Sequence, residues 1–321
     1  MILSNKPPYD ITPKILALLA SISEKIGAIN AHTLSKVNPE LRKQYRIKTI
    51  HASLQIEGNT LNLEQVTAII NSKKIWGPEK DIQEVINAHK VYQELTSFNP
   101  HFSRDFLKAH KLFLSNLIEH PGKYRSKGVG IVKGNRIKHI APPAKRVPEL
   151  MKELFHYLKS KDEIALIKSC VFHYELEFIH PFLDGNGRMG RLWQTLILMQ
   201  SYPLFEFLPL ETLIKDNQEN YYKTLALCDQ KGNSTLFIEF MFEIIDQALA
   251  QVLESKNHTL KDTDRLDSFV EEAPAIFTRK DYMLKYKNIS SATASRDLKK
   301  GLELKYFKSK GDKNKTVYLL K

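Results

Sequence analysis

The run from His180 to Arg191, HPFLDGNGRMGR, constrains the fold more than any other part of the chain. Apolar residues recur at helical spacing before it, and a second helical pattern begins directly after it, so the run must turn the chain between two helices. Gly185 and Gly187 allow backbone conformations that other residues avoid. The turn therefore places backbone N–H groups at the N-terminus of the second helix, where anions bind favourably.

Four side chains in this run suit a phosphorylated ligand. Arg188 and Arg191 lie three residues apart at the start of the helix, and their guanidinium groups match the geometry of phosphate oxygens. Asp184 could bind Mg²⁺, which usually takes one or two protein carboxylates together with substrate phosphates. His180 is available as a general base near neutral pH.

Two other nucleotide motifs fit this part of the chain less well. Residues 185–190 match G-x-G-x-x-G, but that fingerprint follows a buried strand, whereas the segment before Pro181 has helical periodicity. A Walker A loop would need Gly-Lys-Ser/Thr, which the run lacks. Alone, His180 would be interpreted as a loop residue bonded to backbone; the complete run favours a base. The side chains expected to be structural are His173 and Glu177, as a core or surface pair, and Phe182 and Trp193, as core residues.

Most of the remaining chain has helical periodicity. Asn62 and Gln65 form a capping box for one helix. A hairpin is predicted at 128–140, where short apolar runs flank Lys133-Gly134-Asn135. A polar linker follows at 254–264. The helices are predicted at 11–29, 41–57, 62–72, 80–96, 103–119, 148–159, 162–178, 188–200, 217–228, 235–254, 265–271, 278–286 and 290–301.

The positive charge of the chain is concentrated at its C-terminal end. The net charge is +12, and residues 279–321 hold thirteen Lys/Arg against four Asp/Glu, which is +9 and leaves about +3 for the other 278 residues. Any nucleic-acid argument is thus confined to this end. Its last helices and the basic hairpin over 306–320 resemble a winged helix-turn-helix. The alternative is a basic domain used for protein docking or dimerisation.

Composition sets the expected location. Cys170 and Cys228 lie far apart and give neither a disulfide framework nor a zinc pattern. The sequence contains no run of eighteen apolar residues, so no membrane span is predicted. Two prolines lie near the N-terminus where the apolar region of a secretory signal would be, so no signal peptide is predicted. We therefore expect a cytoplasmic protein with no membrane partner.

The run from His180 to Arg191 resembles the signature HPFxDGNGRxxR of the Fic family at every fixed position. The resemblance implies a helical enzyme that transfers AMP from ATP to a hydroxyl of a target protein, with His180 as the base and Mg²⁺ on Asp184. It also implies that the backbone of residues 185–187 cradles the phosphates and that Arg191 reaches the γ-phosphate. The ATP-binding residues implied are Asp184, Gly185, Asn186, Gly187, Arg188, Met189, Gly190 and Arg191.

A second match lies upstream. Residues 53–59, SLQIEGN, resemble the inhibitory motif [S/T]xxxE[G/N] of the same family. The resemblance implies that Glu57 pairs with Arg191 and keeps that arginine from the γ-phosphate, or positions water for removal of AMP. Without the resemblance, this motif would be interpreted as a solvated helix face that ends at a glycine. The inhibitory residues implied are Ser53, Glu57, Gly58 and Asn59.

The hairpin at 128–140 occupies the place of the family's flap, which pairs with a segment of the target protein by strand addition. The resemblance also suggests further nucleotide contacts, at Lys138, His139 and Ile140 in the flap and at Tyr221, Tyr222 and Asp229 downstream. Tyr221 and Tyr222 could instead be helix-packing aromatics.

These observations predict a mainly α protein with a Fic-fold helical core, a β-hairpin flap and a small C-terminal winged helix-turn-helix domain. We divide it into an N-terminal helical region at 1–100 with the inhibitory helix, a catalytic core at 101–254 and a winged-helix domain at 265–321. The predicted function is an autoinhibited adenylyltransferase; the alternative is a nucleotide-sensing, DNA-binding regulator. A homodimer is a further possibility, and the target protein is not encoded in any motif.

Overall fold

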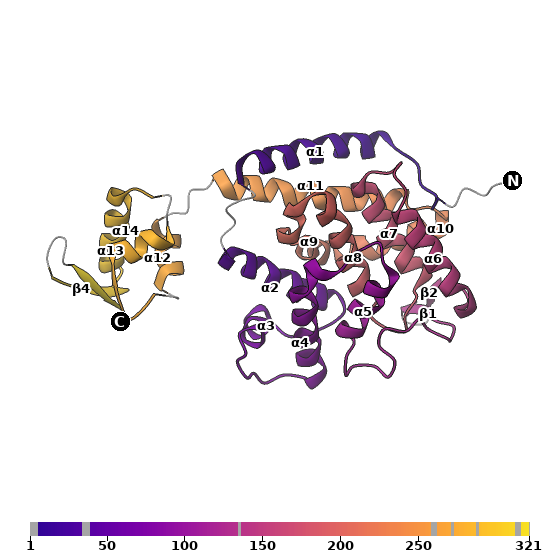
Figure 1. Ribbon diagram of the computed structural model, residues 1–321, viewed down its shortest axis with the longest axis horizontal. Coiled ribbons are helices and arrows are strands. Elements are labelled where there is room, and N and C mark those ends of the chain that lie inside the picture. Colours follow the sequence, from indigo (N-terminus) through magenta and orange to yellow (C-terminus); the bar gives the residue numbers. More distant parts are fainter. Residues whose placement is uncertain are drawn as a thin grey trace. The chain divides into compact units, whose positions relative to one another are not determined.

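The computed structural model describes residues 6–33, 39–133, 136–257, 262–270, 273–286, 289–311 and 316–320. The chain forms two compact units, Met1–Gln251 and Val252–Lys321 (Figure 1). The chain is mainly helical, as predicted. The first unit contains both of the regions that the sequence analysis separates at residue 100. Within the described ranges, none of the helices combines the length and apolar character needed to cross a bilayer.

Helices make up most of the first unit, and the last of them continues a few residues beyond it. They are α1 (Pro13–Thr33), α2 (Pro39–Ile56), α3 (Leu63–Ile70), α4 (Glu79–Gln93), α5 (Ser103–Phe113), α6 (Val147–Leu158), α7 (Ala165–Ile179), α8 (Asn186–Ser201), α9 (Leu210–Asp216), α10 (Gln218–Lys231) and α11 (Thr235–Asn257), with 3-10 turns η1 (Leu95–Ser97), η2 (Ala144–Arg146) and η3 (Pro203–Phe207). Helices α1 and α11 lie side by side (Figure 1), joined by polar contacts such as that of Lys25 Nζ with Asp246 Oδ1 at 2.6 Å.

The core surrounds α7 and α8. Trp193 and Phe182 are fully buried, which confirms their predicted role. The Phe106 ring of α5 stands edge-on to Trp193, with centroids 4.9 Å apart, and stacks on Phe182 at 5.4 Å. Trp193 Nε1 also donates to the Pro100 carbonyl at 3.0 Å, so its one polar atom is satisfied. This aromatic cluster fixes the turn between α7 and α8.

One helix was predicted well past its observed end, and one α-helix was missed. The helix predicted at 103–119 ends at Phe113, because the buried Asn87 side chain of α4 donates to the carbonyls of Phe113 and Ser115 at 3.0 and 2.7 Å. These bonds take the place of further helical turns. Helix α9 has only seven residues, too few for its periodicity to stand out. The capping box of Asn62 and Gln65 is present at the start of α3.

A two-stranded antiparallel hairpin lies at the predicted position, formed by β1 (Gly130–Lys133) and β2 (Arg136–Ile140). The register shifts between Ile131 and Val132, which marks a bulge or similar irregularity. The predicted turn residues Gly134 and Asn135 lie outside the described residues.

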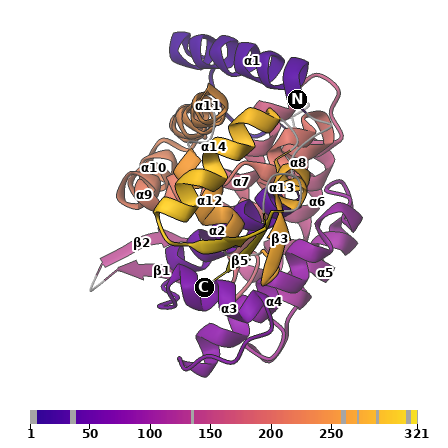
Figure 2. The ribbon, with the colours of Figure 1, turned by 90° about the vertical axis from the view of Figure 1, so that its left-hand side faces the viewer.

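The second unit combines three helices with a small sheet in its described part (Figure 2). Its elements are α12 (Asp262–Val270), β3 (Ile276–Thr278), α13 (Arg279–Lys285), α14 (Ser291–Glu303), β4 (Phe307–Lys310) and β5 (Val317–Leu320). The strands are antiparallel in the order β3-β5-β4. Strand β3 was not predicted, since three residues carry no measurable alternation. Gly301 of α14 lies directly on the Phe307 ring, so this helix packs closely on the sheet.

Candidate functional site

The predicted site forms at the turn between α7 and α8. His180 ends α7: its backbone N–H donates to the Leu176 carbonyl, and its φ of 49° is left-handed. Gly185, with φ of 86°, precedes the first turn of α8. A Cβ at Gly185 would lie 2.7 Å from Leu114 Cδ2, so both the conformation and the space favour glycine here. His180 and the N-terminus of α8 are thus only a short loop apart.

The side chain of Asn186 holds this loop together. Its Oδ1 accepts from the Phe182 N–H at 2.9 Å, and its Nδ2 donates to the Phe182 carbonyl at 3.0 Å. The amide group is therefore used inside the turn. What the start of α8 offers to a ligand is its set of backbone N–H groups, which have no partner within the helix.

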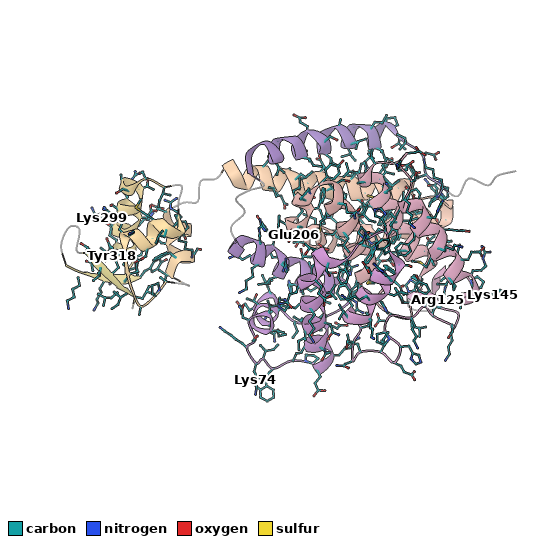
Figure 3. The ribbon with its side chains drawn as sticks, viewed as in Figure 1. Lys74, Arg125, Lys145, Glu206, Lys299 and Tyr318 are labelled. Atoms are coloured by element: carbon teal, nitrogen blue, oxygen red, sulfur yellow. The ribbon has the colours of Figure 1, made fainter. Side chains whose placement is uncertain are left out.

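Arg125, labelled in Figure 3, fixes the conformation of His180 from outside the motif. Its Nε donates to the His180 carbonyl at 2.7 Å, and its backbone N–H donates to the Pro181 carbonyl at 2.9 Å. Its Nη2 donates to the carbonyls of Ile179 and Pro142 at 3.2 and 2.6 Å. A left-handed residue other than glycine costs about 1–2 kcal/mol, which these bonds offset. Arg125 also connects the exit of the hairpin to the turn between α7 and α8.

Arg191 lies almost completely buried against the predicted inhibitory segment. Its Nη2 donates to Glu57 Oε1 at 2.7 Å and to the Ser53 carbonyl at 3.0 Å, and its Nε donates to Ser53 Oγ at 3.1 Å. Burial alone would lower the pKa of Arg191, but the neighbouring groups Glu57, Tyr221 and Glu177, with Glu57 first among them, together more than offset this and raise it. The structure therefore brings together the three side chains that the two motifs supply.

The Glu57 carboxylate also covers the first turn of α8. A Cβ added at Gly187 would lie 2.4 Å from Glu57 Oε1 and 3.0 Å from Arg191 Nη1. A negative group thus already stands at this helix N-terminus, where a phosphate would be favourable. Only glycine at position 187 leaves room for it.

Arg188 is held by a second carboxylate that the sequence analysis missed. Its Nη1 donates to Glu84 Oε1 of α4 at 3.1 Å, and its Nη2 donates to Asp184 Oδ1 at 2.9 Å. Glu84 Oε2 in turn accepts from Asn59 Nδ2 at 2.8 Å. The segment at 53–59 is therefore connected to both arginines of the turn, directly to Arg191 and through Glu84 to Arg188.

His110 of α5 supports the other side of the loop. Its ring stacks on Phe182, with centroids 3.5 Å apart. Its Nδ1 accepts from the Gly122 N–H at 2.8 Å, so the proton is on Nε2, which donates to the Asp184 carbonyl at 3.0 Å. Burial lowers the pKa of His110 to about 4, which keeps this neutral form at physiological pH. His110 thus orients the backbone of Asp184 and not its carboxylate.

A buried polar cluster lies behind Arg191. Tyr221 is 1% exposed, and its hydroxyl contacts His173 Nε2 at 3.1 Å and Glu177 Oε1 at 3.4 Å. His173 Nδ1 contacts Gln194 at 2.6 Å. The expectation that His173 and Glu177 form a structural pair is consistent with these contacts. Burial, followed by the negative charge of Glu57, raises the pKa of Glu177 to about 7.

The other residues predicted to contact the nucleotide lie either on helix α10 or on strand β2. Tyr222 Oη donates to the Ile56 carbonyl at the end of α2 at 3.3 Å, and Tyr174 Oη donates to Asp229 Oδ1 at 3.1 Å. The backbone of Lys138, His139 and Ile140 lies in β2, but their side chains fall outside the described part. Nucleotide contacts at all six positions stay predictions.

Two of the missed residues left some signal in the sequence. Glu84 falls on the same stripe of α4 as the buried residues Val85, Ala88 and Val91, so a carboxylate stands where the helical period requires an apolar residue. Arg125 lies three residues before the start of the predicted hairpin. Neither position reveals its partner, because the partners are distant in sequence.

Comparison with known proteins agrees with this geometry. The model of the Fic/DOC family matches residues 100–198. A Fic family protein from Desulfovibrio desulfuricans G20 is 40% identical, with a TM-score of 0.76 and 98% of each chain covered. Fic-1 from C. elegans is 23% identical over 76% of this chain and 73% of its own, with a TM-score of 0.64, which supports the fold alone.

Named relatives show the same likeness at lower identity. Protein adenylyltransferase Fic of Drosophila mojavensis is 28% identical over 249 residues, and that of Nematostella vectensis is 29% identical over 227. They cover 72% and 66% of this chain but only 46% and 50% of their own, so the chain spans about half the length of these relatives. The D. desulfuricans protein matches this chain over almost the full length of both, and the turn between α7 and α8 carries the complete signature. The chain therefore belongs to the Fic family.

Proposed function

We propose that the protein is an autoinhibited adenylyltransferase that moves AMP from ATP to Ser, Thr or Tyr hydroxyls of a target protein and of itself. One observation carries this proposal: a histidine, a helix N-terminus and two buried arginines converge on a single turn. The relatives named protein adenylyltransferase support the reaction type.

In this mechanism His180 accepts the proton of the target hydroxyl while the hydroxyl oxygen attacks the α-phosphorus of ATP. A new P–O bond forms, the bond to the β-phosphate oxygen breaks, and pyrophosphate leaves with that electron pair. The N–H groups at the start of α8, together with Arg188 and Arg191, neutralise the phosphate charge. A positioned general base contributes about 10²–10⁴ in rate.

Asp184 is the residue that would hold Mg²⁺. Its side chain is 43% exposed, and both of its described hydrogen bonds end on Oδ1, which leaves Oδ2 for the ion. Among the described residues there is no cluster of three or more His, Cys, Asp or Glu that could hold a metal. One carboxylate suits Mg²⁺ that arrives with ATP phosphates, whose charge it would neutralise.

In the proposed resting state Glu57 denies Arg191 to the γ-phosphate. The 2.7 Å ion pair and the position of the carboxylate over Gly187 support this role, since both places would otherwise be free for phosphate oxygens. Because the motif is on the same chain, inhibition would be intramolecular. The same carboxylate, once displaced, could position a water molecule that removes AMP from the target.

Target binding is proposed at the hairpin β1–β2. A target segment would add to this two-stranded sheet as an extra strand, because each of its two strands has an outer edge that pairs with no other strand of the described residues. Such pairing recognises mainly the backbone of the target segment.

Homodimer formation, as a further form of regulation, would be detected by sedimentation at several protein concentrations.

The deciding experiment incubates three proteins with α-labelled ATP, Mg²⁺ and a lysate. Glu57→Gly should transfer more label than wild type, and His180→Ala should transfer none. A Glu57→Gly protein that labels neither itself nor any lysate protein would contradict the proposal. Parallel incubations with other labelled nucleotides, including γ-labelled ATP, would identify a different transferred group.

A second candidate function is DNA binding by Val252–Lys321, which we propose to be a winged helix-turn-helix. The observation in its favour is that α14 and β4 carry four exposed basic side chains: Arg296, Lys299, Lys308 and Lys310. Of the two acidic residues of α14, Asp297 lies buried in a bidentate pair with Arg265, whereas Glu303, the last residue of the helix, is exposed. DNA affinity should fall steeply with salt, and no binding at about 50 mM salt would exclude this function.

A further inference from the structure

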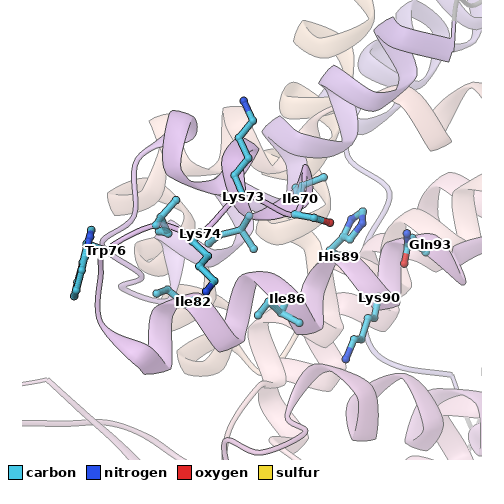
Figure 4. A pocket seen from close by; sticks show the side chains of 12 residues that line it. Ile70, Lys73, Lys74, Trp76, Ile82, Ile86, His89, Lys90 and Gln93 are labelled. Atoms are coloured by element: carbon cyan, nitrogen blue, oxygen red, sulfur yellow. The ribbon is translucent and has the colours of Figure 1, made fainter.

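A partly apolar groove lies between α3 and α4, away from the residues of the proposed mechanism (Figure 4). Its volume is about 910 Å³. Isoleucines from both helices and from the connecting segment line it, among them Ile70, Ile82 and Ile86, and all are only partly buried. A concave apolar surface of this size that remains open to solvent is typical of an interaction site.

The most exposed large hydrophobic residue in the described part of the chain borders the same groove. Trp76 is 95% exposed. Its carbonyl accepts from Gln65 Nε2 at 3.1 Å, and Gln65 itself belongs to the capping box of α3. The backbone beneath the indole is therefore anchored. Tryptophans that stand on a fixed backbone at the edge of an apolar surface are common energetic centres of protein interfaces.

The charge at the groove has one sign. Lys73, Lys74 and Lys90 line it and are exposed, and none of its lining residues, all within the described stretch 39–133, is an Asp or Glu. Burial, followed by the positive charges of Arg46 and Lys43, lowers the pKa of the neighbouring His89. A partner with carboxylates beside apolar side chains would complement both properties.

We propose that this groove binds an acidic segment of a partner protein, with bulky apolar residues of the segment seated on the isoleucines and Trp76. The lysines would steer and orient the segment, and the apolar contacts would hold it. The residues that line the groove are not among those of the proposed AMP transfer. A test of binding at the groove is therefore independent of a test of AMP transfer.

Trp76 provides the assay. The chain has two tryptophans, and the other, Trp193, is fully buried, so changes in emission report on Trp76. The full chain is titrated with short synthetic peptides in which glutamates alternate with leucine and phenylalanine, and with the same peptides carrying glutamine for glutamate. We expect the acidic peptides to shift the emission to shorter wavelength, with affinity that falls as salt rises.

Variants locate the binding surface. The double variant Lys73→Glu/Lys74→Glu should lose about tenfold or more in affinity, since two attractions become repulsions. Lys145→Glu, at another exposed lysine, is the matched control and should bind as wild type. Equal binding of the neutral peptides, an unchanged affinity in the double variant, or no shift with any acidic peptide would overturn the proposal. So would a shift that depends only on protein concentration, which would assign the groove to a second copy of the chain.

Discussion

The Glu57–Arg191 pair gives the sharpest quantitative prediction. The Arg191 side chain is 1% exposed and the Glu57 side chain 25% exposed, so the arginine end of the pair is shielded from solvent and the carboxylate partly so. A hydrogen bond between charged groups of this kind contributes about 1.5–3 kcal/mol. If this hydrogen bond stabilises the inhibited state by that amount, its removal raises the fraction of protein that can bind ATP productively. The increase is about tenfold to a hundredfold, at 1.4 kcal/mol per factor of ten. Glu57→Gln removes this charge and keeps most of the volume.

The assay is the initial rate of label transfer from α-labelled ATP. Glu64→Gln, at an exposed glutamate of α3, is the matched control and should behave as wild type. Glu57→Gly should be at least as active as Glu57→Gln, since it also clears the space above Gly187. A Glu57→Gln protein that is folded and no faster than wild type would refute the reasoning.

Three further predictions test the supports of the site. Tyr222→Phe removes a hydrogen bond to the end of α2, worth about 0.5–1.5 kcal/mol, so label transfer should rise about two- to tenfold; a fall would indicate a nucleotide contact instead. Gly190→Ala places a Cβ 2.5 Å from a buried histidine ring and should lower the free energy of unfolding by about 1–3 kcal/mol in urea titrations, whereas Gly27→Ala, in open space on α1, should raise it by about 0.5–1 kcal/mol. Burial lowers the pKa of His110 to about 4, so between pH 6.5 and 4 the histidine is protonated in the unfolded chain but not in the folded one. The difference in unfolding free energy between wild type and His110→Gln should therefore shrink as the pH falls from 7 to 4.5. A difference that stays constant over this pH range would contradict the prediction.

The turn between α7 and α8 could be predicted because its parts are adjacent in the sequence. Helical period, glycines and charged residues of the run from His180 to Arg191 act within one turn, so local rules apply to all of them. The same rules place α8 and the capping box of α3 within two residues of their observed bounds.

The rest of the site depends on contacts across the fold. Glu84 meets Arg188 from 104 residues away, and Arg125 meets His180 from 55 residues away. The early end of α5 has the same origin, since Asn87 of another helix caps it. Sequence periodicity indicates which face of a helix is buried, but it does not identify the residue on the facing helix.

The burial of Arg191 means that its positive charge always needs a counter-ion. A guanidinium on a side chain that is 1% exposed is costly without one, so under the proposed mechanism the Glu57 carboxylate and the phosphate of ATP would be alternative anions for the same cation. Glu177, with a pKa of about 7 and Glu57 among the causes, would ionise more readily once Glu57 leaves. Release of the Glu57 carboxylate would then be accompanied by loss of the proton from Glu177. The ionised Glu177 would balance the charge of Arg191 in the empty site until ATP binds.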